Sequence, residues 1–285
     1  MTNPEIPIFG QIIVIANEKG GCGKSTIAMH IGVGLLKAGH SVTALDLDVR
    51  QATLRHYLDN RLTWSDCTGI PLNIPTVATA ELYEFPSAEE RLASSQALRE
   101  RIRSLSEKSN FLVIDTPGHN SYLMPVVHEM ADILVTPLND SLLDVEVLGE
   151  VDADSCAVRD ISHYARMVEE ARAERRLSTG KDIDWIVLRN RLSMLSSHNN
   201  RAVGESLQVL SRHLNFRLVD GLAERVVFRE LFPRGLTAVD DLDTSVLGAR
   251  PTMSHATARF EIETLLSEIM NTGLGQGRTV DCNAA

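Results

Sequence analysis

A glycine-rich stretch near the start of the chain carries the residues best suited to bind a phosphate. Residues 17–26 read NEKGGCGKST, directly after an apolar run and directly before a helical pattern. Glycines let successive backbone N–H groups face one anion, and the N-terminus of the following helix favours negative charge. The expected phosphate contacts are Gly20, Gly21, Cys22, Gly23, Lys24, Ser25 and Thr26.

Two side chains in this stretch have roles that their chemistry predicts. Lys24 would neutralise the β- and γ-phosphates of a nucleotide, and the Ser25 hydroxyl would bind the accompanying Mg²⁺. The strict Walker A pattern also requires glycine at position 18, where the chain has Glu18. A glycine-rich turn without a ligand is the alternative, but the order of apolar run, glycines, Lys-Ser and helix favours a phosphate-binding loop.

A second lysine, Lys19, lies inside the same loop. Two cations close together repel each other unless an anion lies between them, so Lys19 gains little from a phosphate that Lys24 already neutralises. If two copies of the chain meet face to face, Lys19 can instead reach the nucleotide of its partner. In this the chain resembles the ParA/MinD family of deviant Walker A ATPases, whose signature lysine has that role. The resemblance implies a homodimer with ATP at its interface.

Three acids follow apolar runs further along the chain. Asp46 and Asp48 end the run from Val42 to Leu47 with a spacing of two, which puts both carboxylates on one side at the carboxyl end of the sheet. Asp115 ends a later run, as the Walker B acid does. We expect Asp46 and Asp115 to hold Mg²⁺ through water and Asp48 to orient or deprotonate the attacking water, although each acid could instead cap a turn. The expected catalytic residues are therefore Lys19, Lys24 and Asp48.

The resemblance also implies where adenine would bind. In the family an asparagine just after a late strand contacts the base, and Asn190 holds that place in the segment from Trp185 to Arg191. A later loop, Phe232 to Gly235, could wall the ring through Pro233. The alternative for both segments is an ordinary polar loop.

These residues require a scaffold whose strands end at one edge. Short apolar runs, mostly without alternation, indicate strands that are covered on both faces. They are Gln11 to Ala16, Val42 to Leu47, Phe111 to Ile114, Ile133 to Val135, Trp185 to Leu188 and Arg217 to Val219. Helical stretches such as Ser25 to Ala38 and Ser87 to Lys108 lie between them. The alternation predicts an α/β fold with a doubly wound, mostly parallel sheet flanked by helices.

A single domain is expected for most of the chain. With 285 residues and a hydrophobic content of 44%, the chain can bury one sizeable core, which we place in residues 1–270. Residues 271–285 are rich in glycine and are expected to fray. The segment from Asp152 to Thr179 is expected to form a solvated amphipathic helix inserted in the fold.

Composition argues against several classes of protein. The net charge is −10, so any contact with nucleic acid must be a local patch. The four cysteines form no C-x-x-C pair, which argues against a zinc knuckle or a disulfide framework. Cys22 is expected to fill space rather than to act in redox chemistry. The N-terminus lacks a secretory signal and no run reaches the length of a membrane span, so a cytoplasmic protein is expected.

Within the ParA/MinD family the chain resembles the MipZ branch. The resemblance rests on residues 17–19, 46–51, 138–141, 184–191 and 227–233. It implies a dimerising, slow, Mg²⁺-dependent ATPase that binds double-stranded DNA without sequence preference and blocks FtsZ polymerisation. The monomer would be recruited by ParB near chromosome origins. Such a protein would associate with the nucleoid and the origin, would not bind membrane, and would position the division site.

The segment from Trp185 to Gly235 gives separate support for a DNA contact. It carries eight arginines and four acids, a net charge of +4, which leaves −14 on the remainder of the chain. A local phosphate-binding face has this kind of asymmetry. A solvated surface with intramolecular ion pairs is the alternative. The DNA-binding candidates are Arg189, Arg191, Arg201 and Arg212.

Other branches of the family fit less well. A MinD-like protein would end in a basic amphipathic helix, whereas the stretch from Phe260 to Met270 has three glutamates and no basic residue. A nitrogenase iron protein would need cluster cysteines, which Cys67 and Cys156 do not match. A ParA-type chromosome or plasmid partition ATPase remains the alternative. A nucleotide-gated scaffold without hydrolysis would have no need of Asp48.

Overall fold

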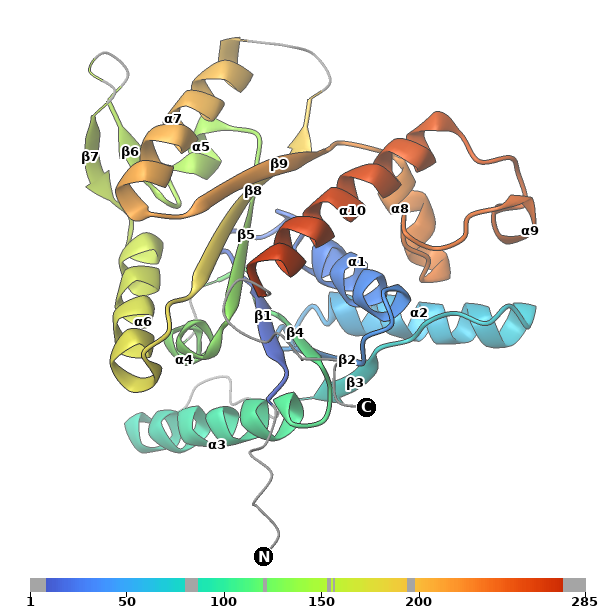
Figure 1. Ribbon diagram of the computed structural model, residues 1–285, viewed down its shortest axis with the longest axis horizontal. Helices are drawn as coiled ribbons and strands as arrows, with labels where there is room; N and C mark the ends of the chain where they lie inside the picture. Colours follow the sequence, from blue (N-terminus) through green and yellow to red (C-terminus); the bar gives the residue numbers. More distant parts are fainter. Residues whose placement is uncertain are drawn as a thin grey trace, which may run out of the picture.

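A seven-stranded sheet forms the centre of the molecule (Figure 1). The computed structural model describes residues 9–79, 87–119, 122–152, 155, 157–193 and 198–273. The strand order is β3-β2-β4-β1-β5-β8-β9, and every neighbouring pair is parallel. The strands are β1 (Gln11–Ile15), β2 (Val42–Asp46), β3 (Thr76–Thr79), β4 (Phe111–Asp115), β5 (Ile133–Asn139), β8 (Asp184–Leu192) and β9 (Arg217–Ala223). The predicted α/β fold with a doubly wound parallel sheet is confirmed.

Helices cover both faces of this sheet (Figure 1). On one face lie α3 (Ala88–Ser106), α4 (Met124–Met130), α6 (His163–Thr179) and α7 (His198–Leu214). On the other face lie α1 (Lys24–Lys37), α2 (Thr53–Thr68), α8 (Val227–Leu231) and α10 (Met253–Gly273). Shorter elements are α5 (Leu142–Val145), β6 (Gly149–Val151), β7 (Val158–Ile161), the 3₁₀ turn η1 (Phe232–Arg234) and α9 (Thr244–Leu247).

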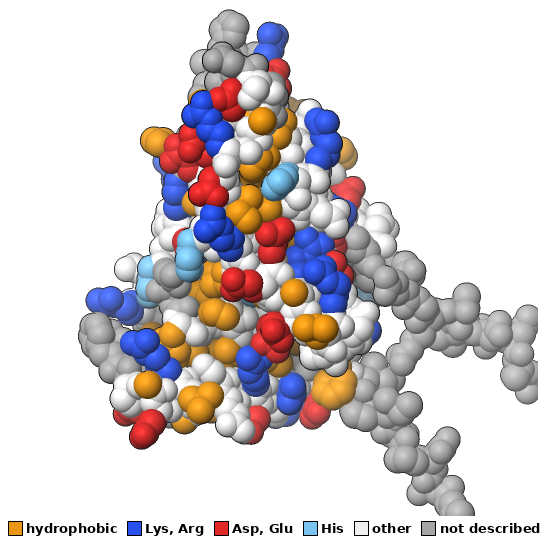
Figure 2. Space-filling model, turned by 90° about the vertical axis from the view of Figure 1, so that its left-hand side faces the viewer, with side chains coloured by type: hydrophobic (Ala, Val, Ile, Leu, Met, Phe, Trp, Pro, Cys, Tyr) orange, Lys and Arg blue, Asp and Glu red, His pale blue; other side chains and the backbone are white. Residues whose placement is uncertain are grey.

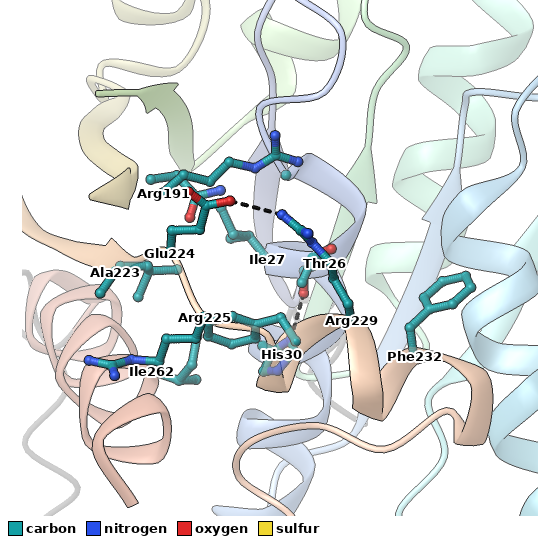
Figure 3. Close-up of a pocket in the computed structure, with 14 residues that line it drawn as sticks. Thr26, Ile27, His30, Arg191, Ala223, Glu224, Arg225, Arg229, Phe232 and Ile262 are labelled. Atoms are coloured by element: carbon teal, nitrogen blue, oxygen red, sulfur yellow. Dashed lines mark hydrogen bonds and ion pairs between the residues drawn. The ribbon is translucent and has the colours of Figure 1, made fainter. Parts of the chain in front are cut away.

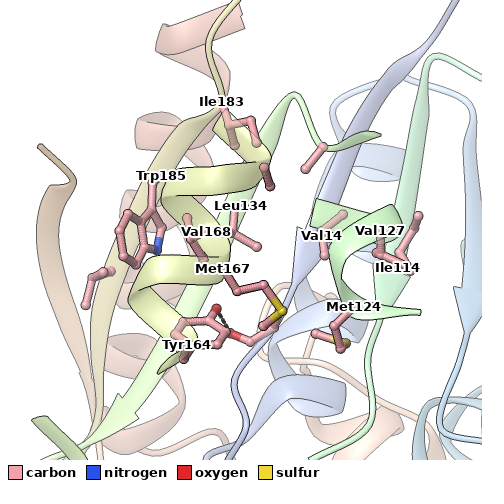
Figure 4. Packing of buried hydrophobic residues seen from close by; sticks show 14 of the residues in the cluster. Val14, Ile114, Met124, Val127, Leu134, Tyr164, Met167, Val168, Ile183 and Trp185 are labelled. Carbon is pink, nitrogen blue, oxygen red and sulfur yellow. Dashed lines mark hydrogen bonds between the residues drawn. The ribbon is translucent and has the colours of Figure 1, made fainter. Parts of the chain in front are cut away.

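Each central strand supplies side chains to two separate apolar layers. Along β1, Ile12 and Val14 belong to one buried layer, while Ile13 and Ile15 belong to the other. Figure 4 shows the first layer, in which Val14 and Leu134 lie among residues of α4 and α6. Because successive strand residues point to opposite faces, a strand covered on both sides must be apolar throughout. This explains why the apolar runs in the sequence mark the strands without alternation.

The segment after β5 differs from the sequence prediction. The prediction of an inserted solvated helix from Asp152 onward is wrong, because β7 pairs antiparallel with β6 and α6 begins only at His163. Residues 153, 154 and 156, including Cys156, lie outside the described part of the chain. Tyr164, Met167 and Val168 of α6 are buried against the sheet. The helix therefore serves as the crossover that leads to β8.

The last helix extends past the domain boundary that the sequence predicts. α10 continues to Gly273, and residues 274–285 of the expected tail lie outside the described residues. Across the described ranges, no helix combines the length and the apolar character that crossing a bilayer requires.

Candidate active site

The glycine-rich loop connects β1 to α1 at the carboxyl edge of the sheet. Asn17 fixes its start, because the buried side-chain amide donates to the Pro137 carbonyl at 2.7 Å and accepts from the Lys19 N–H at 2.8 Å. Gly23 has a φ of 93°, and a Cβ there would come within 2.3 Å of the Asn190 amide nitrogen. A glycine is thus required where the loop enters α1.

Lys24 is buried within this loop. Its ammonium donates to the Asn17 carbonyl at 3.1 Å and to the Lys19 carbonyl at 2.9 Å. The loop after β4 approaches the same place, since a Cβ on Gly118 would meet the Gly20 Cα at 2.8 Å and the Lys24 Nζ at 3.2 Å. A phosphate beside Lys24 would therefore lie close to both the glycine-rich loop and the loop after β4.

Asp115, at the end of β4, is fully buried. It pairs in register with Asp46 on the neighbouring strand, so both predicted metal residues lie side by side. Neither carboxyl oxygen of Asp115 has a hydrogen-bond partner of good geometry in the described structure. Burial raises the pKa of Asp115 to about 8; the Ser25 hydroxyl and the Lys24 ammonium lower it, whereas the carboxylates of Asp46 and Asp48 raise it. An unsatisfied buried carboxyl is costly, and a divalent cation with its water shell would satisfy it.

This donor set fits Mg²⁺ bound mainly by phosphate and water. No cluster of three or more His, Cys, Asp or Glu side chains suited to a metal occurs within the described ranges. Mg²⁺ at nucleotide sites keeps several waters and takes the remaining ligands from phosphates and few side chains. Ser25 is the direct ligand that the sequence predicts, with Asp46 and Asp115 acting through water.

Of the other two acids, Asp46 ends β2 and Asp48 lies in the turn between β2 and α2. Asp46 accepts from the backbone N–H groups of Asp48 at 2.9 Å and Arg55 at 3.1 Å, and Asp48 accepts from the Gln51 N–H at 3.1 Å. Burial raises the pKa of Asp46, against these backbone N–H groups, which lower it. The hydrogen bonds of Asp46 and Asp48 within the chain are therefore those of turn-capping residues. Asp48 also lines the cleft over the glycine-rich loop.

A cleft of about 550 Å³ lies over the glycine-rich loop. Predicted residues that line it are Gly20, Gly21, Gly23, Lys24, Ser25, Thr26 and Asp48. Arg191, which the sequence predicts as a DNA contact, also lines this cleft, as does Gly118 in the loop after β4. Lining residues that the sequence analysis did not single out are Arg50, Gln51, Thr53, Thr116 and His119. Most of these follow the ends of β2 and β4. The rule that ligands bind beyond the carboxyl ends of parallel strands could have identified them.

A second cavity of about 300 Å³ adjoins the cleft and shares Gly23, Thr26 and Arg191 with it (Figure 3). Asn190 lines this cavity, as predicted for a base contact, and its side-chain amide donates to the Cys22 carbonyl at 2.8 Å. Other lining residues, which the sequence analysis did not single out, are Ile27, His30, Leu222, Ala223, Glu224, Arg225, Phe228, Arg229 and Ile262. Pro233 does not line it; the preceding Phe232 does.

His30 forms part of this second cavity in its neutral form. Burial lowers the pKa of His30 to about 4. Its Nε2 accepts from the Ala238 N–H at 3.1 Å, so the proton lies on Nδ1, which donates to the Thr26 carbonyl at 2.7 Å. An uncharged, fully bonded ring gives the cavity an apolar floor suited to a flat base.

Lys19 points away from both cavities. Its ammonium donates to the Leu143 carbonyl of α5 and lies 3.7 Å from the Asp144 carboxylate. The side chain is 37% exposed. Leu142 and Leu143 beside it are also exposed. Within one chain, therefore, Lys19 does not contact the phosphate cleft.

Cys22 is buried under the loop. Burial raises the pKa of its thiol, while the nearby Lys24 ammonium lowers it. A raised thiol pKa disfavours the reactive thiolate, so the environment agrees with packing rather than redox chemistry.

The arginines of the basic segment fall into two groups. Four arginines form ion pairs within the chain: Arg189 with Asp140, Arg217 with Asp184 and Glu268, Arg225 with Glu261, and Arg229 with Glu224. Arg201 and Arg212 lie on α7, eleven positions apart, which is close to three helical turns and places both on one side. Figure 2 shows the face that includes α6 and α7, where acidic, basic and apolar side chains are intermixed. Among the described residues no carboxylate forms an ion pair with Arg201 or Arg212, so the ion-pair alternative accounts for only part of the segment.

Comparison with known protein families places the chain among ATPases. Residues 11–272 match the model of a family described as ATPase MipZ. The septum site-determining protein MinD of Helicobacter pylori is 26% identical over 160 residues, which is 50% of this chain and 60% of that protein. A ParA protein of Rhizobium radiobacter is 23% identical over 136 residues, 48% of this chain and 52% of that protein. The matches span 60 to 66% of the lengths of the MinD relatives from H. pylori, Emiliania huxleyi and Synechocystis.

Solved structures share the fold at lower identity. A McdA variant from Cyanothece in complex with ATP superposes with a TM-score of 0.61 at 19% identity, covering 92% of this chain and 97% of that one. The MinD protein of Pyrococcus horikoshii with Mg-ADP has a TM-score of 0.55 at 18% identity, covering 93% and 97%. At these identities the likeness establishes the fold alone.

Proposed function

The chain belongs to the MipZ family of ATPases, and on that premise we propose that it is a Mg-ATP-dependent switch that hydrolyses ATP slowly and positions the division site. The observation that carries the proposal is the fully buried carboxyl of Asp115, which has no hydrogen bond of good geometry to any described residue and lies close to Ser25 and Lys24. Ser25 and Lys24 in turn line the cleft of about 550 Å³. A chain that had lost its metal-nucleotide site would not retain a buried acid without a partner at that point.

Each group at the site has a distinct part in the reaction. Bound Mg²⁺ supplies positive charge that stabilises the transferring phosphoryl group. Lys24 neutralises the β- and γ-phosphates together with the backbone N–H groups of the glycine-rich loop. Asp48 lines the cleft and orients the attacking water. Because Gly118 lies so close to Gly20 and the Lys24 ammonium that a Cβ there would come within 2.8 Å and 3.2 Å of them, loss of the γ-phosphate would be transmitted to the loop after β4.

Asp48→Ala is expected to bind ATP with nearly parental affinity and to release phosphate about 100-fold more slowly, because water positioning affects the transition state more than ground-state binding. The measurement is steady-state phosphate release by the pure protein. Asp66→Ala, which removes an exposed acid from the helix α2 that follows Asp48, is the matched control and should keep parental turnover. Parental turnover in Asp48→Ala would show that another group orients the water. No release by the parent would favour a nucleotide-gated scaffold.

Dimerisation is proposed to place ATP between two copies of the chain. Lys19 is partly exposed, lies outside its own phosphate cleft and is flanked by the exposed Leu142 and Leu143. A second copy that buries these leucines could accept Lys19 at its nucleotide. Two phosphate-binding loops repel each other, and the bound anion would provide the bridge between them.

The dimer is proposed to bind double-stranded DNA without sequence preference and to block FtsZ assembly, whereas the monomer returns to ParB near the origin. These partners come from the family and not from any contact in this chain. A patch that binds DNA phosphates weakly on one copy gives a useful affinity for DNA only when two copies are joined. Slow hydrolysis would then act as a timer between a nucleoid-bound state and an origin-associated state in the cytoplasm.

Replacing Arg201 and Arg212 together with alanine is expected to weaken DNA binding by roughly ten-fold or more and to flatten its salt dependence, because both lie on one side of α7 and would contact phosphates. The measurement is affinity for two unrelated duplexes at several salt concentrations. The control variant replaces Arg101 and Arg103 on α3, which removes the same charge from another helix. Unchanged affinity, or loss on only one duplex, would contradict a non-specific contact at α7.

A ParA-type partition ATPase is the second candidate, favoured by the similarity to the R. radiobacter ParA protein. The two functions differ in one testable activity. A division regulator stops FtsZ polymerisation in the presence of ATP, and a partition ATPase does not. FtsZ assembly followed by light scattering, with and without Mg-ATP and this protein, separates the two.

A further inference from the structure

Arg191 occupies an unusual backbone position at the end of β8. Its φ is 54°, in the left-handed region that side chains other than glycine, asparagine and aspartate seldom adopt. The pairing of β8 with β9 changes register between Asn190 and Leu192, as in a β-bulge. In a regular strand consecutive side chains point to opposite faces. Here Asn190 and Arg191 line the same cavity, so the irregular backbone redirects Arg191 toward it.

Arg191 also lies where the two cavities meet. The residues common to both are Gly23, Thr26 and Arg191, and only Arg191 carries a charged side chain. Figure 3 shows this side chain extending from the strand end across the cavity toward α1. Its guanidinium thus lies between the space over the glycine-rich loop and the space beside Asn190.

The other arginines of the second cavity are neutralised by neighbouring acids. Arg225 pairs with Glu261 at 2.7 Å, and Arg229 pairs with Glu224 at 2.8 Å. Across the described ranges no carboxylate lies within ion-pair distance of the Arg191 guanidinium. The junction therefore has one uncompensated positive charge and would favour an anion.

We propose that Arg191 binds the α-phosphate of the adenine nucleotide, an inference that rests on the proposed function. If the β- and γ-phosphates lie over Lys24 and the base lies beside Asn190, the α-phosphate is the anionic group that spans the junction. A guanidinium has only donors, so it binds an anionic phosphate oxygen in preference to the neutral ribose. Since ATP and ADP share this phosphate, Arg191 contributes equally to both. It therefore raises affinity without favouring either state of the switch.

The test compares two substitutions at this position. Arg191→Gln removes the charge, and Arg191→Gly removes it while suiting the left-handed backbone, so strain cannot explain a loss that both share. Isothermal titration with Mg-ADP, in the absence of DNA, is expected to show an affinity about ten-fold or more below that of the parent for both variants. Steady-state hydrolysis should show KM raised by the same factor with kcat unchanged. Arg191→Lys should restore part of the affinity.

A matched variant and a second binding assay make the outcome decisive. Arg101→Gln, on α3 and outside both cavities, should bind Mg-ADP like the parent. Parental ADP affinity in Arg191→Gly would overturn the inference, and loss of DNA binding alone would assign Arg191 to the DNA face. Failure here leaves the proposed function intact as long as Lys24→Ala abolishes nucleotide binding. Parental nucleotide binding by Lys24→Ala would remove the proposed function itself.

Discussion

Replacing Lys24 with alanine is expected to abolish ATP binding while the fold is retained. The ammonium lies inside the glycine-rich loop, where it donates to the carbonyls of Asn17 and Lys19. Without it, the β- and γ-phosphates would lose their principal positive partner, which corresponds to an affinity loss of about 100-fold or more. The hydrogen bonds of the Lys24 ammonium to described residues are all inside the glycine-rich loop, with the Asn17 and Lys19 carbonyls and the Cys22 sulfur, so thermal unfolding should change little.

Titration calorimetry with Mg-ATP measures this effect. Lys37→Ala is the matched control, because Lys37 lies at the other end of α1 in an ion pair with Asp241. The control should bind ATP like the parent. Equal affinity of Lys24→Ala and the parent for Mg-ATP would show that the glycine-rich loop is not the phosphate site.

The second large effect is expected for Lys19→Ala, which should remain a monomer at nucleotide concentrations that convert the parent into a dimer. In the described structure of one chain, the Lys19 ammonium donates to the Leu143 carbonyl and lies beside Asp144, both in the α5 region. Its loss should therefore leave binding of one nucleotide nearly intact. If Lys19 acts on the nucleotide of a partner, removing it deletes the cation that the bridging anion requires.

Loss of the dimer should carry further losses with it. DNA binding and inhibition of FtsZ assembly are expected to fail together in Lys19→Ala, since both are assigned to the dimer. Sedimentation with a non-hydrolysable ATP analogue tests the variant beside Lys37→Ala. A Lys19→Ala protein that dimerises as well as its parent would remove the reason for placing ATP between the subunits.

Motifs that lie within one strand and the loop after it were predictable from the sequence. β1 leads to the glycine-rich loop, and β2 and β4 lead to Asp46 and Asp115, so short-range order alone locates these residues. The pairing of Asp46 with Asp115 follows once the two strands are neighbours. The core was predictable for a similar reason, because strands covered on both faces are apolar throughout.

Features that depend on distant partners could not be found in the same way. β3 has the sequence TVAT and is recognised only by its pairing with β2 at the edge of the sheet. The second cavity gathers residues from α1, β8, β9, α8 and α10, which no local pattern connects. Arg189 was predicted as a DNA contact because it lies in a basic segment. In the structure it forms an ion pair with Asp140, which the segment after β5 contributes. Local charge counting does not detect such pairs.

If the bound nucleotide determines the oligomeric state, the mass of the parent protein in solution must change with the nucleotide. Sedimentation or light scattering would be carried out without nucleotide, with Mg-ADP and with a non-hydrolysable Mg-ATP analogue. We expect the 31.4 kDa monomer in the first two conditions and twice that mass in the third. One mass in all three conditions would contradict it.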